Sequence, residues 1–95
     1  MTAVLVHHRV ADYDAWKAEY DRVVAGPLAG DLRTHRVWRG EDDPNLVVVS
    51  QTFDSREAAE ALFTSQEVRD EMANAGVDMS SLQIEYLDEV DSGTR

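Results

Sequence analysis

The sequence predicts an α+β fold in which a four-stranded antiparallel sheet carries its helices on one face, in the order β-α-β-β-α-β. The 95 residues are enough for one small domain with one core. Four segments are rich in the β-branched and aromatic residues that are typical of strands. Between them, two regions repeat apolar residues at the spacing of one helix face. This order is the ferredoxin-like arrangement.

The first half of the chain predicts a strand, a helix and a second strand. Residues 2–10 form an apolar, β-branched run. Asp12 suits the N-cap of a helix, and Gly26-Pro27 ends that helix. Residues 33–39 have the composition of the second strand. The predicted apolar face of the helix consists of Tyr13, Trp16, Tyr20 and Val23.

A polar hairpin over residues 40–45 leads into the third strand, which we place at residues 46–53. Asp54 and Glu57 have the spacing of a capping box, and so have Thr64 and Glu67. We therefore expect two consecutive helical pieces. The second of them stops at Gly76.

Residues 82–90 alternate between apolar and polar side chains and predict the last strand. The chain contains no internal repeat and no change of composition that would divide it. We expect a single domain over residues 1–91, with a frayed tail over residues 92–95.

The composition of two predicted strands indicates that the sheet has a binding partner. Residues 3–6 and 46–49 are apolar without alternation, and a strand directs successive side chains to opposite faces. These strands are therefore expected to bury both faces, whereas the helices cover only one. A second copy of the chain on the free face is the simplest cover, so we expect a homodimer.

Charge and composition exclude several classes of function. Nine basic and nineteen acidic residues give a net charge of −10, the wrong sign for nucleic acid or anionic lipid. The absence of cysteine excludes disulfides, zinc–thiolate sites and thiol nucleophiles. No signal peptide and no membrane-spanning stretch is recognised, so we expect a soluble, cytoplasmic protein.

No metal site is predicted. His7 and His8 are neighbours on one strand and point to opposite faces, so one ion cannot bind both within one chain. His35 is the third imidazole, and no carboxylate lies at a suitable local spacing to complete a ligand set.

Aromatic and sulfur-containing side chains are the candidate walls of a pocket between sheet and helices. Their polar tips and flat rings suit a flat, phenolic ligand, although the same residues are also ordinary core residues. Ser50, a lone serine among valines, could donate a hydrogen bond to such a ligand. The candidate substrate-binding residues are Tyr13, Trp16, Tyr20, Trp38, Phe63 and Met72.

His8 is the candidate general base. It shares a strand face with Val4 and Val6, and if the helices cover that face, apolar surroundings hold the imidazole neutral and ready to accept a proton. His7 would then face the dimer interface, and the opposite assignment of the two histidines stays open. Arg36 is the candidate stabiliser of an anion. Alternatively, the basic segment 33–39 pairs with the acidic last strand of a partner.

Several segments together resemble small bacterial proteins of the antibiotic biosynthesis monooxygenase-like group, some of which are called cyclases. The segments are VADYDAWKAEYDR, HRVWRGEDDPNLVVV, FDSREAAEALF and EVRDEMANAGV. The resemblance covers residues 4–90 and implies a dimeric α+β barrel, in which two ferredoxin-like sheets form eight strands. It also implies a pocket between sheet and helices in each subunit.

The haem-degrading branch of that superfamily does not fit this sequence. Its pattern places an asparagine on the first strand and a haem-binding histidine in the second helical region. Here the only asparagines are Asn45 and Asn74, and residues 55–75 contain no histidine. We therefore expect no cofactor.

Two functions remain. The first is small-molecule chemistry, namely cofactor-independent oxygenation or polyketide-type cyclisation of an aromatic substrate, in which the protein binds, desolvates and deprotonates it. The alternative is a non-catalytic dimeric binding or structural protein. A pocket above about 300 Å³ into which a histidine and an arginine converge would favour the first, and a filled interface the second.

Overall fold

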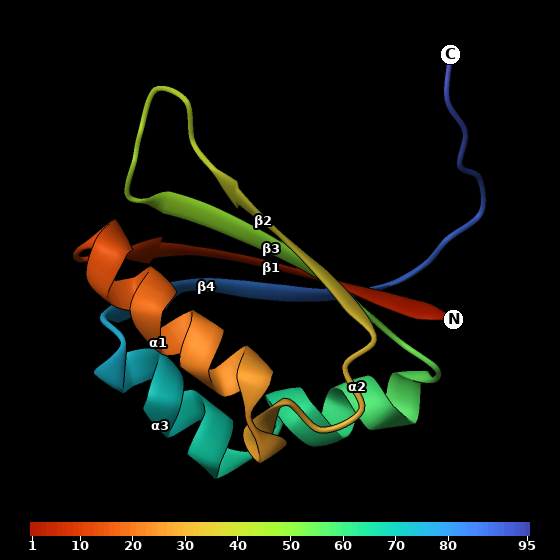
Figure 1. Cartoon of the computed structure of the whole chain (residues 1–95), viewed down its shortest axis with the longest axis horizontal. Coiled ribbons are helices and arrows are strands. Elements are labelled where there is room, and N and C mark those ends of the chain that lie inside the picture. The colour runs from red at the N-terminus through yellow and green to blue at the C-terminus, as the bar shows by residue number, and fades with distance from the viewer.

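The computed structural model describes all residues, 1–95, and confirms the α+β, ferredoxin-like fold. Four antiparallel strands form one sheet in the order β2-β3-β1-β4, and the helices all lie on one side of it (Figure 1). A short 3₁₀ turn, η1, follows α1. The elements are β1 (Thr2–Val10), α1 (Tyr13–Ala25), η1 (Pro27–Ala29), β2 (Thr34–Arg39), β3 (Leu46–Phe53), α2 (Arg56–Phe63), α3 (Gln66–Asn74) and β4 (Val77–Asp88).

The two central strands bury every second residue under the helices. On β1 the side chains of Val4, Val6 and His8 are buried, and those between them are half-buried. On β3 the buried residues include Val49 and Gln51. The predicted Val4–Val6 face is therefore the face that the helices cover. A strand that looks apolar throughout still has a fully buried side and a partly open side.

Helix α1 begins as predicted, whereas the caps of the next two helices differ from the prediction. The Asp12 carboxylate accepts a hydrogen bond from the backbone N–H of Ala15 at 3.0 Å. Helix α2 is capped by Ser55 and not by Asp54, because Asp54 instead binds the guanidinium of Arg33. Thr64 closes α2, with its hydroxyl donating to a carbonyl of that helix, and so does not cap α3.

The last strand is longer than predicted and starts earlier. It begins at Val77 and ends at Asp88, whereas the alternation predicted residues 82–90. Val77 pairs with Val10, and a bulge in the register then separates this pair from the regular ladder that contains the Val6–Ile84 pair. The bulge disrupts the alternation of residues 77–81, which is why the sequence pattern missed them. Residues 89–95 have no regular structure.

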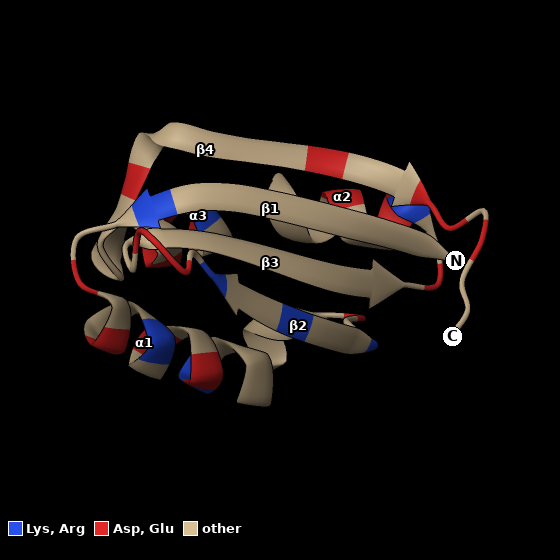
Figure 2. Ribbon diagram, turned by 90° about the horizontal axis from the view of Figure 1, so that it is seen from above, with Lys and Arg blue, Asp and Glu red and all other residues tan.

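No helix covers the other face of the sheet in the single chain (Figure 2). Leu5 and Val48 are half-buried there. Trp38 pairs with Val48 and is 54% exposed, and Leu87 on β4 is 43% exposed. The sheet therefore presents an uncovered apolar surface on the side away from the helices. Among the helices, none has the length and hydropathy needed to cross a membrane.

Candidate functional site

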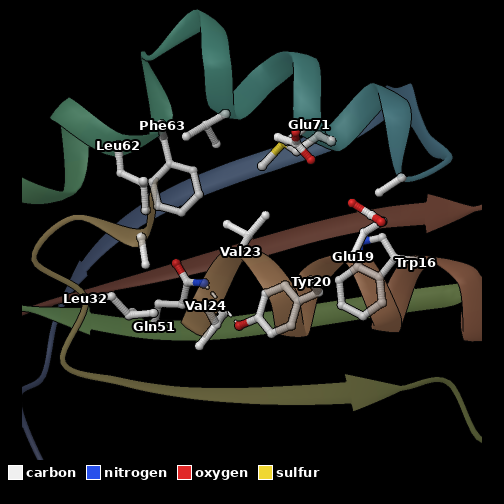
Figure 3. A pocket seen from close by; sticks show the side chains of 14 residues that line it. Trp16, Glu19, Tyr20, Val23, Val24, Leu32, Gln51, Leu62, Phe63 and Glu71 are labelled. Atoms are coloured by element: carbon white, nitrogen blue, oxygen red, sulfur yellow. Dashed lines mark hydrogen bonds between the residues drawn. The ribbon is translucent and has the colours of Figure 1, made fainter. Parts of the chain in front are cut away.

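A pocket of about 80 Å³ lies between α1, the α2–α3 pair and the sheet (Figure 3). Eleven of its 14 lining residues are hydrophobic. Trp16 and Tyr20 come from α1, Phe63 and Met72 come from the other helices, and Gln51 comes from β3. The helices position these side chains because each packs an apolar face on the sheet. A pocket of this size and lining would suit a small, mostly apolar ligand.

Three aromatic side chains of α1 contact one another in a row, and two of them, Trp16 and Tyr20, form one wall of the pocket. The rings of Trp16 and Tyr20 are stacked with centroids 5.0 Å apart, and those of Tyr13 and Trp16 are 5.9 Å apart. The guanidinium of Arg39 lies 4.1 Å from the centroid of the Tyr13 ring. This spacing is the range in which aromatic pairs attract one another, so the stack holds a fixed, flat surface.

A chain of hydrogen bonds connects the pocket to the surface. The amide nitrogen of Gln51 donates to the hydroxyl of Tyr20 at 3.2 Å, and that hydroxyl is 3.2 Å from Nδ1 of His35. Burial raises the pKa of Tyr20, an effect that the hydrogen bond from Gln51 partly offsets. Gln51 is buried, whereas His35 is exposed on the edge strand β2. The amide of Gln51 and the hydroxyl of Tyr20 thus form one hydrogen-bonding group in the pocket wall.

His8 lies behind the aromatic wall. Its ring meets Trp16 edge-on with centroids 5.5 Å apart, and it is not among the lining residues. The side chain is 3% exposed, and its Nδ1 has no protein partner. Burial lowers its pKa from 6.5 to about 4, so the imidazole is neutral at pH 7. His7 points to the open face, 4.0 Å from Glu85.

An ion pair links two helices at one end of the pocket. The guanidinium of Arg22 on α1 donates at 2.8 Å to Glu19 on the same helix and at 2.8 Å to Glu71 on α3. Both carboxylates belong to lining residues. Because the side chain of Arg22 is 61% exposed, this contact contributes little energy and acts mainly by holding α1 beside α3.

The structure brings together four of the predicted wall residues, namely Trp16, Tyr20, Phe63 and Met72. The other predicted site residues lie elsewhere. Tyr13 and His8 touch Trp16 without lining the pocket. Arg36 and Trp38 lie on the open face of the sheet, because they pair with Ser50 and Val48, which alternate with the buried residues of β3. Neither takes part in this pocket.

Sequence reasoning missed Gln51. It considered Ser50 as the polar residue of β3, but Ser50 faces the open side and its neighbour faces the pocket. The signal was present, since Gln51 interrupts an alternating series of apolar residues, Val47, Val49 and Phe53. A polar side chain on the buried side of a strand needs hydrogen-bond partners and is therefore informative. No three His, Asp or Glu side chains gather as a metal site would require.

Comparison by sequence finds no match: no protein-family model fits the chain, and no curated protein matches it. Comparison by structure finds similar folds. A variant of SnoaB, a cofactor-independent oxygenase from Streptomyces nogalater, superposes with a TM-score of 0.75 at 11% identity, over 96% of this chain and 94% of that one.

Two further solved structures have a similar fold. An antibiotic biosynthesis monooxygenase gives a TM-score of 0.72 at 14% identity, over 96% of this chain and 100% of that chain. Rv0793 from Mycobacterium tuberculosis gives 0.68 at 17% identity, over 98% of both chains. The chain thus has the fold of structures described as antibiotic biosynthesis monooxygenases, as the sequence resemblance predicted.

Proposed function

We propose that this protein binds a small, flat aromatic molecule in the pocket beside Trp16 and Tyr20 and oxidises it with molecular oxygen, without a cofactor. The observation that carries the proposal is a mostly apolar pocket with one aromatic wall and a hydrogen-bonding group, Gln51 with Tyr20, beside that wall. Such a pocket orients a flat ring and removes water from it. The fold similarity to SnoaB, described as a cofactor-independent oxygenase, supports the same activity. A cyclase acting on a similar substrate would use the same pocket.

Cofactor-independent oxygenation requires few catalytic groups from the protein. A substrate whose CH₂ group loses a proton to give a stabilised carbanion can reduce molecular oxygen itself, and the net reaction converts CH₂ and O₂ into C=O and H₂O. The protein supplies a binding surface and a base. His8 is the predicted base, but it lies behind Trp16 without lining the pocket and its pKa is lowered, so both its position and its basicity count against this role. The second candidate is His35, which would receive the proton through Tyr20, as the Tyr20 hydroxyl gives its own hydrogen to Nδ1 of His35 and takes one from the substrate.

The test uses 2-indanone, a small flat ketone with an acidic CH₂ beside its ring. Binding is followed by the NMR signal of the Trp16 indole N–H, and the Trp38→Phe variant assigns it, since the chain has two tryptophans. Turnover is followed with an oxygen electrode. We expect a shift of the Trp16 signal and oxygen uptake that Trp16→Ala abolishes. His8→Ala tests the predicted base: a tenfold or greater fall in binding or rate, with the subunits still paired, would assign the role to His8, and an unchanged rate would assign it to His35 acting through Tyr20.

The alternative function, a dimeric binding protein without turnover, is favoured by one observation. The cavity of about 80 Å³ is smaller than the pockets of about 300 Å³ or more that usually hold such ligands, and neither a histidine nor an arginine lines it. Binding of 2-indanone without oxygen uptake would support this alternative. Absence of binding by this and related ring compounds would contradict both functions.

We also propose that two copies pair through the open face of the sheet, which would form a dimeric α+β barrel. Support comes from the uncovered apolar side chains of β1, β2 and β3 and from the exposed Leu87. Light scattering should give twice the 10.7 kDa of one chain. Val48→Glu, on the open face, should dissociate the pair, whereas Val49→Glu, 2% exposed under the helices, should unfold the subunit. A stable monomer at micromolar concentration would refute the pairing.

A further inference from the structure

We infer that Gln51 recognises the hydrogen of a ligand hydroxyl in this pocket, and that His35, acting through Tyr20, fixes the amide with its carbonyl facing the ligand. The inference rests on the proposed function, because it names the class of molecule that the pocket selects. That class is a small ring compound with one hydrogen-bond donor, such as a phenol.

The first observation is a carbonyl without a partner. Gln51 is 7% exposed, and no protein group donates to its Oε1, which is itself buried. Its amide nitrogen already donates to Tyr20. In Figure 3 the oxygen of Gln51 is turned away from Tyr20, toward the side where Phe63 lies. A buried carbonyl without a donor is unfavourable, so a ligand that brings a donor is stabilised there.

The second observation explains why the carbonyl, and not the NH₂ group, is turned away from Tyr20, toward the side of the pocket where Phe63 lies. The hydroxyl of Tyr20 has one hydrogen, and Nδ1 of His35 lies within hydrogen-bonding distance of that hydroxyl. With Nδ1 unprotonated, Tyr20 donates to His35 and can only accept from Gln51. The amide must then direct its N–H toward Tyr20 and its oxygen away from it. His35 is thus a positioning residue, because it sets the polarity of the pocket without lining it.

The apolar walls around Gln51 strengthen the preference for a ligand that carries a hydrogen-bond donor. Apart from Gln51 and Tyr20, the walls near this corner are apolar, as Leu62 and Phe63 show. A ligand hydroxyl therefore finds one strong acceptor, whereas a methyl group at the same place would leave the carbonyl unpaired. Sites that hydrogen-bond a substrate group discriminate strongly against analogues that lack it.

The experiment compares phenol with toluene, which have nearly the same size but differ in the donor. Both are titrated against the isotope-labelled full chain, and the Trp16 indole signal is followed by NMR. We expect phenol to bind about five to ten times more tightly than toluene. Gln51→Met keeps the length of the side chain and removes both amide atoms. It should abolish the preference for phenol while leaving toluene binding unchanged or improved, which shows that the pocket is intact.

The positioning role is tested with His35→Leu. Without His35, Tyr20 is free to donate to Gln51, and the amide can turn its NH₂ group into the pocket. The preference for phenol should therefore fall, although the side chain that is removed does not line the pocket. The matched controls are Gln83→Met and His7→Leu, which make the same substitutions on the open face of the sheet and should keep the full preference.

The outcomes separate the inference from the proposed function. Equal affinity for phenol and toluene in the unmodified protein, or a preference that survives Gln51→Met, overturns the inference and leaves the pocket proposal standing. A preference that is lost in Gln51→Met but kept in His35→Leu overturns the positioning role. If neither compound shifts the Trp16 signal, the proposed pocket fails and the inference fails with it.

Discussion

Lowering the pH from 7 to 5 should reduce the free energy of unfolding by about 2 kcal/mol through His8 alone. The ring is 3% exposed against Trp16, and burial lowers its pKa from 6.5 to about 4. In the unfolded chain the same imidazole has its ordinary pKa. Between these two values the unfolded state binds a proton that the folded state does not, so stability falls as the pH falls.

The size of the effect follows from the separation of the two pKa values. Each pH unit between them removes about 1.4 kcal/mol, because one unit of pKa difference corresponds to that free energy. Little is lost above pH 6.5, where both states are neutral. The loss is complete below pH about 4, where both states are protonated, and amounts to about 3 kcal/mol in total.

Urea unfolding at pH 7 and at pH 5, at one protein concentration, measures this loss. Carboxylates titrate over part of the same range, so the quantity of interest is the difference between the unmodified protein and His8→Leu. The variant should lose about 2 kcal/mol less than the unmodified protein between the two pH values. An equal loss in His8→Leu would refute the buried, neutral state of His8.

Two further predictions concern local structure. A Cβ at Gly40 would lie 2.5 Å from the carbonyl oxygen of Asp43, so Gly40→Ala must distort the hairpin and should lower the free energy of unfolding by about 1–3 kcal/mol. Gly93→Ala, with nothing within 4 Å, should have no effect, and an equal loss there would contradict the argument. Asp12→Ala removes the acceptor for the N–H of Ala15 and should cost about 1 kcal/mol in urea unfolding. Asp12→Asn should keep most of that stability, and a full loss in this variant would show that the cap is not what matters.

Local patterns predicted the positions of most elements. The bounds of β1 and β3 agree with the predicted residues 2–10 and 46–53, because long β-branched runs leave few alternatives. The N-cap at Asp12 was also predictable, since the acceptor and the N–H it binds lie three residues apart in the chain. Which side of β1 the helices cover stayed open in the sequence, and the structure places Val4, Val6 and His8 on the buried side.

Tertiary contacts decided what local patterns left open. Asp54 and Ser55 both suit an N-cap, and the ion pair of Asp54 with Arg33, 21 residues away, leaves the cap to Ser55. The early start of β4 at Val77 depends on pairing with the end of β1. Such choices depend on residues distant in sequence, which no short window contains.

The candidate site, like the fold, depends partly on local sequence patterns and partly on tertiary contacts. From the sequence alone, Arg36 and Trp38 share one face of their strand, but an edge strand with one half-buried apolar residue does not reveal which face the helices cover. The register with β3 decides it and turns both residues away from the pocket. The sequence by itself thus determined the order of the elements and the alternation along the central strands β1 and β3. Only the tertiary structure joined Gln51, Tyr20 and His35, because strand register and helix placement, rather than composition, bring their polar atoms within hydrogen-bonding distance.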